Sequence, residues 1–179
     1  GVGLTERGYG KGWHASLSVA GKELNNAGND NDSRTWATRV HWNPVASKAA
    51  TVHLGAWAFH EEIAAGASGV LRSSAIAGHF NDLVKIAPGT LVGAERSTAY
   101  GLEAAGFFGP AWATGEWGTR NLRGVDASGR YDLDHEAWAV SAGWFLAGAL
   151  PAYSGKAGTW GKVKVADPVT DGGAGAWEL

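Results

Sequence analysis

Apolar and polar side chains alternate along six stretches of the sequence. In the first of them, Trp13, Ala15 and Leu17 alternate with the polar residues His14 and Ser16. A period of two places neighbouring side chains on opposite faces of a β-strand. The pattern therefore predicts strands with one apolar and one polar face over residues 13–20, 36–42, 52–59, 100–105, 111–117 and 138–146.

These stretches suit strands that cross a membrane. They run to about ten residues, whereas a soluble strand has about five or six and a tilted barrel strand needs about 9–11. Tryptophans recur near their ends, as in the aromatic girdles of membrane barrels: Trp13, Trp36, Trp42, Trp117, Trp138 and Trp144. We therefore expect an all-β fold, an antiparallel transmembrane β-barrel with lipid outside and a water-filled lumen inside.

The connections between the stretches differ in length. Two are compact, at Asn43–Ala49 and Gly106–Pro110, and the second predicts a hairpin that pairs residues 100–105 with residues 111–117. Three are longer, and barrels have long loops on one side and short turns on the other: residues 25–32, 121–136 and 149–175.

Residues 61–95 do not follow the alternation clearly. The two compact turns lie on one side of a barrel only if the chain crosses the membrane an even number of times between them. A single strand, for example over residues 72–81, would break that rule, and residues 61–67 could also form a short helical piece. The pattern leaves these alternatives open.

Composition narrows the function classes. The chain has 179 residues, 10 Trp, 28 Gly and no Cys, with a formal net charge of −2. The length predicts one domain over residues 1–179, the lack of Cys excludes thiolate metal sites, and the charge disfavours nucleic acid as a partner. Without a phosphate-binding loop or a nucleophile motif, we expect neither a cofactor nor an enzyme.

The last residues, Gly175–Leu179, resemble the start of a strand. About seven or eight strands are half of a large barrel, and lipid does not tolerate the open edges of a half barrel. We therefore expect residues 1–179 to be part of one longer barrel that has further strands before and after them. The alternative is a complete soluble β-sandwich.

Several short stretches, in their order and spacing over residues 41–179, resemble the phosphate-selective porin O/P family of bacterial outer membranes. They are Val52-His53-Leu54-Gly55-Ala56, Tyr100-Gly101-Leu102-Glu103-Ala104-Ala105, Gly109-Pro110 with Thr114-Gly115-Glu116-Trp117, Gly143-Trp144-Phe145-Leu146-Ala147-Gly148 and Gly175-Ala176-Trp177-Glu178-Leu179. The resemblance implies an antiparallel barrel of roughly 16 strands. It also implies a homotrimer in outer-membrane lipid that passes small anions such as phosphate.

The chain departs from the family at two places. A basic Arg-x-Arg-Pro-Glu stretch often follows the third segment in the family, where this chain has Ala77-Gly78-His79-Phe80-Asn81. The acidic residue that commonly follows the Trp-Phe-Leu-Thr-Gly stretch is replaced by Ala149. Since the first departure removes positive charge, the resemblance implies a weak rather than a strong preference for phosphate.

The strand period also selects candidate pore-lining residues. If the apolar residues Val40, Leu54, Leu102, Val140 and Leu146 face lipid, their polar neighbours face the lumen. Those neighbours are Arg39, His41, His53, Glu103 and Glu116. On a soluble sheet the same side chains would form an ordinary hydrated face.

Three lysines in the longest connection are candidate anion contacts: Lys156, Lys162 and Lys164. The porin resemblance permits a loop folded into the channel there, where ammonium groups replace part of an anion's hydration shell. A solvated extracellular loop is the equal alternative.

Two other clusters invite catalytic or metal-binding interpretations. His53 and His60 lie seven residues apart, which places them on opposite faces of a strand and argues against a shared metal ion. Glu103 and Glu116 share a face of the predicted hairpin, and paired carboxylates can perform acid–base chemistry. Hydrated carboxylates in a lumen are the simpler interpretation, so we expect no catalytic and no metal site.

Three functions compete for this pattern. The leading one is a passive outer-membrane diffusion channel for small solutes with a weak anion preference. The second is a soluble β-sandwich that binds carbohydrate through its tryptophans, and the third is a structural barrel without transport. A binding module would gather its tryptophans in one concave site, whereas a barrel places them at strand ends on the apolar face.

Overall fold

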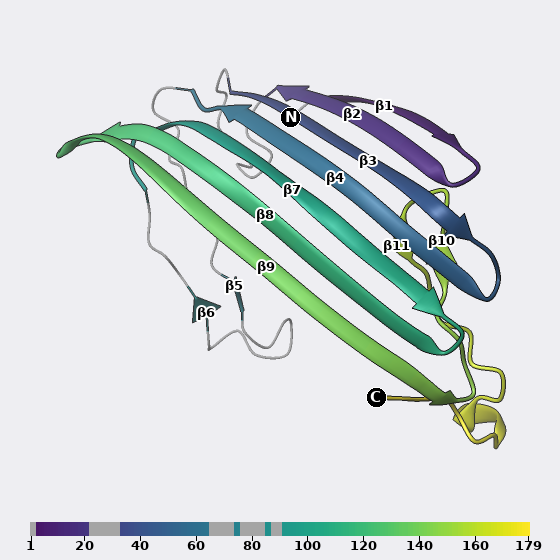
Figure 1. The fold of residues 1–179 in the computed structure, drawn as a ribbon. Coiled ribbons are helices and arrows are strands. Elements are labelled where there is room, and N and C mark those ends of the chain that lie inside the picture. The colour runs from purple at the N-terminus through teal and green to yellow at the C-terminus, as the bar shows by residue number, and fades with distance from the viewer. Residues whose placement is uncertain (1–2, 22–32, 65–73, 76–84, 87–90) are drawn as a thin grey trace.

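The computed structural model describes residues 3–21, 33–64, 74–75, 85–86 and 91–179. Its main feature is an eight-stranded antiparallel sheet in the order β1-β2-β3-β4-β7-β8-β9-β12 (Figure 1). Its strands are β1 (Gly3–Gly10), β2 (Trp13–Gly21), β3 (Arg34–Ala46), β4 (Ala50–Glu62), β7 (Ala94–Phe108), β8 (Ala111–Asp126), β9 (Gly129–Ala147) and β12 (Trp177–Glu178). The remaining elements are two small ladders and a 3₁₀ turn: β5 (Ser74–Ala75) with β6 (Lys85–Ile86), β10 (Tyr153–Ser154) with β11 (Thr159–Trp160), and Val169–Asp171.

Each of the six predicted stretches lies within a strand of this sheet. The predicted hairpin is confirmed, because β7 and β8 pair antiparallel with Leu102 opposite Trp117, and the turn places Gly109 at a φ of +55°. The alternation does not reveal β1, since Gly8 and Gly10 contribute no side chain to the face that they share with Trp13.

The strand order answers part of the question that the sequence left open for residues 61–95. β4 pairs directly with β7, from Ala50 opposite Phe108 to Glu62 opposite Arg96, so no crossing of the main sheet lies between them. Residues 61–62 continue β4 and are not helical. The rest of the expected helical piece and most of the alternative strand over residues 72–81 lie outside the described residues.

Two predicted connections are shorter than the sequence indicated. The expected long loop over residues 121–136 is wrong, because β8 and β9 pair from Asp126 opposite Gly129 onward and leave only a tight turn. The compact turn after β3 begins later than Asn43, because β3 continues through a register shift between Trp42 and Val45. Five strands consequently reach 13 to 19 residues, beyond the ten or so that we expected: β3, β4, β7, β8 and β9.

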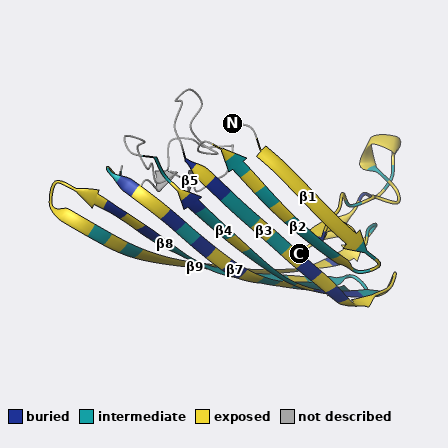
Figure 2. Ribbon diagram, turned by 90° about the horizontal axis from the view of Figure 1, so that it is seen from above, coloured by how far each residue is buried: buried dark blue, intermediate teal, exposed yellow. Residues whose placement is uncertain are grey.

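The sheet is curved, and buried and exposed residues alternate along its strands (Figure 2). Large apolar side chains on the convex face are open to the surroundings, with exposed fractions of 74% for Trp138 and 72% for Val140. Polar side chains on the concave face are covered, and His53 is only 3% exposed. This distribution is the reverse of a soluble β-sandwich, whose apolar faces pack on each other, so the sandwich alternative is not favoured.

The six tryptophans that the sequence placed at strand ends all lie on the convex face. Cross-strand register joins Trp13 to Trp42 near the compact turns, and Trp117 to Trp138 farther along the strands. Along β9 the outward positions are mostly apolar over 138–146 and become acidic beyond them, at Glu136, Asp134 and Asp132. The convex face is therefore an apolar band bounded by aromatic and charged residues.

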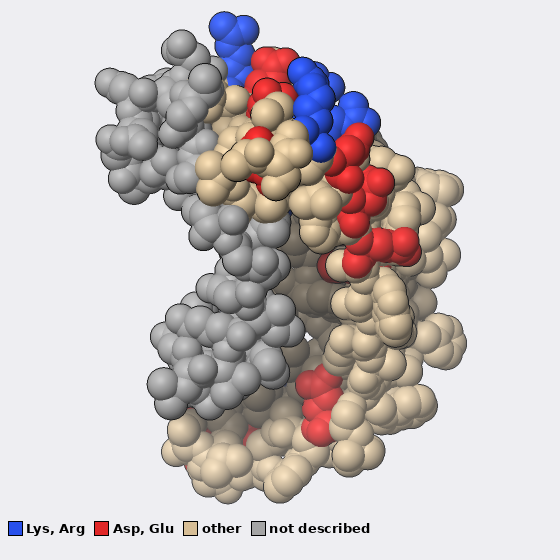
Figure 3. Space-filling model, turned by 90° about the vertical axis from the view of Figure 1, so that its left-hand side faces the viewer, with Lys and Arg blue, Asp and Glu red and all other residues tan. Residues whose placement is uncertain are grey.

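The concave side is hollowed, and charged side chains gather at the end of the sheet away from the compact turns (Figure 3). The register places one row of charged residues of both signs there, on the convex face: Arg34, Glu62, Arg96, Arg123 and Asp132. No helix in the described part of the chain is long and apolar enough to span a bilayer.

The longest connection, residues 148–176, leaves β9 at the end of the sheet where the compact turns lie. It carries the β10–β11 hairpin back over the concave face of β3, β4 and β7 (Figure 1). It then returns to β12, which pairs with β9, with Trp177 opposite Ala147. The strand expected at residues 175–179 is thus confirmed.

Candidate functional site

Aromatic packing seats the β10–β11 hairpin on the concave face. The Trp160 ring lies 5.7 Å from that of Trp112, 6.0 Å from Tyr153 and 6.5 Å from Phe107, measured between ring centroids. Trp112 and Phe107 lie opposite each other on β8 and β7. Edge-to-face aromatic contacts of this kind stabilise by about 0.5–1.5 kcal/mol each beyond area burial, so the cluster holds one end of the hairpin.

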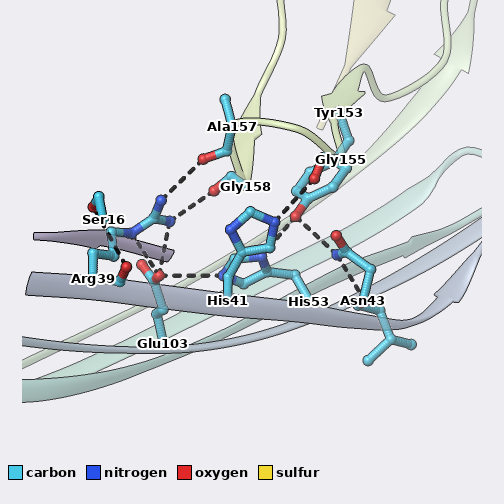
Figure 4. A network of polar contacts seen from close by, with 11 residues as sticks. Ser16, Arg39, His41, Asn43, His53, Glu103, Tyr153, Gly155, Ala157 and Gly158 are labelled. Carbon is cyan, nitrogen blue, oxygen red and sulfur yellow. Dashed lines mark hydrogen bonds and ion pairs between the residues drawn. The ribbon is translucent and has the colours of Figure 1, made fainter. Parts of the chain in front are cut away.

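Arg39 of β3 fixes the other end of the hairpin through its backbone (Figure 4). Its two terminal nitrogens donate to the carbonyl oxygens of Ala157 and Gly158, at 3.0 and 2.8 Å. The same guanidinium also binds Oε1 of Glu103, at 2.8 Å from Nε and 2.7 Å from a terminal nitrogen. Charge-assisted hydrogen bonds are the strong ones, and this side chain joins β3, β7 and the hairpin.

A chain of hydrogen bonds runs from Asn43 to Glu103 through the hairpin. The Asn43 amide donates to the Tyr153 hydroxyl oxygen at 2.9 Å and to the carbonyl of Val52 at 3.0 Å. The Tyr153 hydroxyl lies 2.6 Å from His53 Nδ1, and His53 Nε2 lies 3.3 Å from Glu103 Oε1. The two ring nitrogens of His53 are satisfied when the hydroxyl donates to Nδ1 and Nε2–H donates to the carboxylate, whereas Asn43 Oδ1 is buried without a partner among the described residues.

Burial raises the pKa of the Tyr153 hydroxyl, although the hydrogen bond from Asn43 opposes the shift. The phenol therefore keeps its proton at neutral pH, as donation to His53 requires. Three imidazoles stack beside it, with ring centroids 5.6 Å apart between His14 and His41 and 5.0 Å apart between His41 and His53. His41 Nε2 lies 3.0 Å from the carbonyl oxygen of Gly155 and thus also contacts the hairpin.

A glycine is required where the hairpin turns over His41. Gly158 has a φ of +65°, a region that L side chains rarely adopt. A Cβ at this position would also collide with the His41 ring. Sequence alone gave no reason to single out Gly158, because the ring beneath it comes from a distant strand.

All five candidate pore-lining residues lie on the concave face. Arg39, His53, Glu103 and Glu116 line a hollow of about 270 Å³ beneath the hairpin, and Thr114, Tyr153 and Trp160 complete its wall. His41 is level with Glu103 and Glu116 across the sheet, since the register pairs His41 with Gly55, Gly55 with Glu103, and Glu103 with Glu116.

The three lysines do not form a cluster. Lys156 lies on the hairpin, with its ammonium 4.0 Å from the ring centroid of Tyr9 on β1. Lys162 and Lys164 follow the hairpin and are exposed. Whether any of them contacts an anion stays a prediction.

Sequence reasoning missed two residues of this network, Asn43 and Tyr153. The sequence predicts Asn43 at the start of a turn, but the register shift in β3 turns its amide toward the hairpin. Tyr153 stands in a connection without strand period. An aromatic residue between Pro151 and Gly155 was the one available signal.

The charge balance of the network limits what it can attract. Arg39 is paired with Glu103, while Glu116 has no side-chain partner among the described residues. Such a surface can hydrate and orient a passing solute, but it holds little uncompensated positive charge.

Comparison with known proteins identifies the family. The sequence model of the family "phosphate-selective porin O and P" matches residues 2–179. The chain belongs to this family. No curated protein and no solved structure gave a significant match. The match begins well before residue 41, where the resemblance seen in the sequence began.

Together with the family match, the curved antiparallel sheet is a segment of a porin β-barrel of the bacterial outer-membrane type. Membership associates the porin with membranes and with anions, phosphate among them, and favours a channel over an enzyme. The departure at residues 77–81 lies outside the described residues, and Ala149 follows the end of β9.

Proposed function

We propose that this porin is a passive diffusion channel of the bacterial outer membrane for small solutes, with a weak preference for anions such as phosphate. It acts without a cofactor or an energy source and catalyses no reaction. The observation that carries the proposal is the reversed distribution of side chains. Apolar residues such as Val140 are exposed on the convex face, and polar residues such as His53 are covered on the concave face.

The weak preference follows from the inward charges. A cation at contact distance in water attracts an anion by about 1 kcal/mol. Arg39 is compensated by Glu103, and Glu116 opposes anions directly. Lys156 on the hairpin, with Lys162 and Lys164 after it, adds positive charge that favours anions.

The partners of the convex face are outer-membrane lipid and further copies of the same chain. Glu6 lies on this face, opposite Leu17. A charged side chain is unfavourable against lipid tails, so we place a subunit contact of a homotrimer near β1. Unheated gels test this placement. An oligomer that stays intact in E6L and dissociates in E6K would support it, and a strictly monomeric protein would contradict it.

Reversal potentials of the whole protein in planar bilayers under a potassium chloride gradient test the channel. We expect ohmic conductance without added cofactor, and a potential slightly on the anion-selective side. Clear cation selectivity would refute the anion preference. Absence of conductance would refute the channel and favour the purely structural barrel.

A further inference from the structure

A second hollow of about 430 Å³ lies on the concave face over β8 and β9. Its side-chain lining consists of alternate residues on each strand, as expected for one face of a sheet. The floor consists of the small residues Ala99, Gly118, Ala137 and Ala139, and Trp57 forms a wall. Three polar residues lie at the ends of the hollow: Glu116, Arg120 and His135. The volume is in the usual range of small-molecule sites.

Trp57 of β4 lies across the two neighbouring strands. A Cβ added at Gly101 would come within 2.5 Å of Trp57 Cζ2, and one at Gly118 within 2.9 Å. The two glycines therefore provide the space in which the indole reaches from β4 to β8. The indole N–H has no hydrogen-bond partner within the described part of the chain, and Trp57 lies on the opposite face from the Trp117 and Trp138 pair.

Arg120 is held by one atom, which leaves its other donors available. Its Nε donates to the Ser97 hydroxyl at 2.8 Å, and Ser97 is fully buried. Neither terminal nitrogen of Arg120 has a partner among the residues that the structure describes. A guanidinium fixed in this way presents two parallel donors, the geometry that matches a carboxylate.

We propose that this hollow binds an organic anion with a flat apolar ring, namely an aromatic carboxylate, during its passage through the lumen. The ring stacks on Trp57 above the floor of Gly118, Ala137 and Ala139, and the carboxylate binds Arg120. This proposal rests on the proposed channel function and names a substrate class for it. Glu116, at the other end of the hollow, repels the carboxylate and so fixes its direction.

The lining argues against the other small solutes. Phosphate needs several donors, and here Arg120 supplies the main charge while the floor is apolar. A sugar needs polar partners around its ring, whereas the residues beside Trp57 are Gly and Ala. An aromatic carboxylate satisfies both parts of the site, because its ring is apolar and its charge is confined to one end.

Block of the chloride current in planar bilayers tests the proposal with three probes. Sodium benzoate carries the ring and the charge, sodium acetate the charge alone, and benzamide the ring alone. We expect benzoate to block half of the current at a concentration at least about tenfold below those of the other two. Equal half-block by benzoate and acetate would overturn the proposal while leaving the channel function intact.

Variants locate the site. W57L and R120Q should each raise the half-blocking concentration of benzoate by about tenfold, while W57F, which keeps a ring, should retain most of the block. The matched controls are W144L and R123Q, which change the same residue types on the convex face, outside the lining of the hollow, and should leave the block unchanged. Unaltered block in W57L and R120Q would overturn the assignment to this hollow. A wild-type protein without chloride current would instead refute the channel itself.

A folded barrel migrates differently on gels when it is unheated. If W57L does not reach this folded form, W57F and R120Q together test whether benzoate binds in the hollow. Block that persists in W57F and falls in R120Q supports the site. Block that persists in both overturns it.

Discussion

At the scale of single residues, the most consequential contact is the one between Arg39 and Glu103. The two side chains come from β3 and β7, and they meet because β4 carries Gly55 between them, where a Cβ would collide with the Glu103 carboxylate. The pair neutralises the guanidinium that the sequence alone suggested as a free lumen cation. The same guanidinium still holds two backbone carbonyls of the hairpin.

Neutralising one partner at a time separates these roles. E103Q should raise the anion-to-cation permeability ratio, by up to about fivefold if one uncompensated charge contributes about 1 kcal/mol, and R39Q should lower it. Reversal potentials report both shifts. The control is E136Q on the convex face, which should leave the ratio unchanged, and shifts of the same sign in E103Q and R39Q would contradict the argument.

At the scale of strands, each element has an outward and an inward series of positions with different tolerances. Along β9, Val140 faces out and its neighbour Ser141 faces in, because the register aligns Ser141 with Thr114 on the concave side. The outward series is apolar only over 138–146, although β9 itself begins at Gly129. The remaining residues of the strand lie beyond the apolar band, and their outward positions are charged: Arg130, Asp132, Asp134 and Glu136.

An arginine introduced at neighbouring positions of β9 tests this difference. V140R should lower the free energy of unfolding in lipid vesicles by about 2–4 kcal/mol, the cost of Arg or Lys near the bilayer midplane, whereas S141R should change it by at most about 1 kcal/mol. Urea titration of the vesicle-inserted protein measures both values. Equal costs for the two variants would mean that residue 140 does not face lipid.

The strands could be predicted because the period of two dominates wherever one face meets lipid and the other water. It weakens where that contrast ends. Asn121, Arg123 and Asp132 are polar on the convex face, so the distal parts of β8 and β9 looked like a loop. The five candidate residues share one face of the sheet. Tyr153 and Asn43 join them through contacts between distant segments that no local pattern encodes.

At the scale of the whole molecule, the curved wall and the inner hairpin have different roles. The wall carries the apolar band toward lipid and the hollow with Trp57 and Arg120 toward the lumen. The hairpin narrows the space in front of β3, β4 and β7, and it brings Lys156 to the edge formed by β1. The net charge of −2 leaves no large excess of cations to enforce strong anion selectivity.

A triple variant, K156A/K162A/K164A, assigns the anion preference. Because these lysines follow or occupy the hairpin, their removal should shift the reversal potential toward zero or into the cation-selective range while the single-channel conductance stays of the same order. Lys48 in the compact turn provides the comparison. K48A should leave the reversal potential unchanged. An unchanged potential in the triple variant would assign its lysines to a merely solvated surface.

The path of residues 148–176 has a consequence for how such channels diversify. The chain leaves β9 at Gly148 and comes back beside it, with the amide of Ala166 bonded to the Gly148 carbonyl and Trp177 opposite Ala147. Strand order, hand and shear are the same whether this excursion is long, short or absent. The width of the channel is thus set by a segment that can be exchanged independently of the strands. New permeation properties can arise there by insertion, deletion or grafting, without any change to the wall that must seal against lipid.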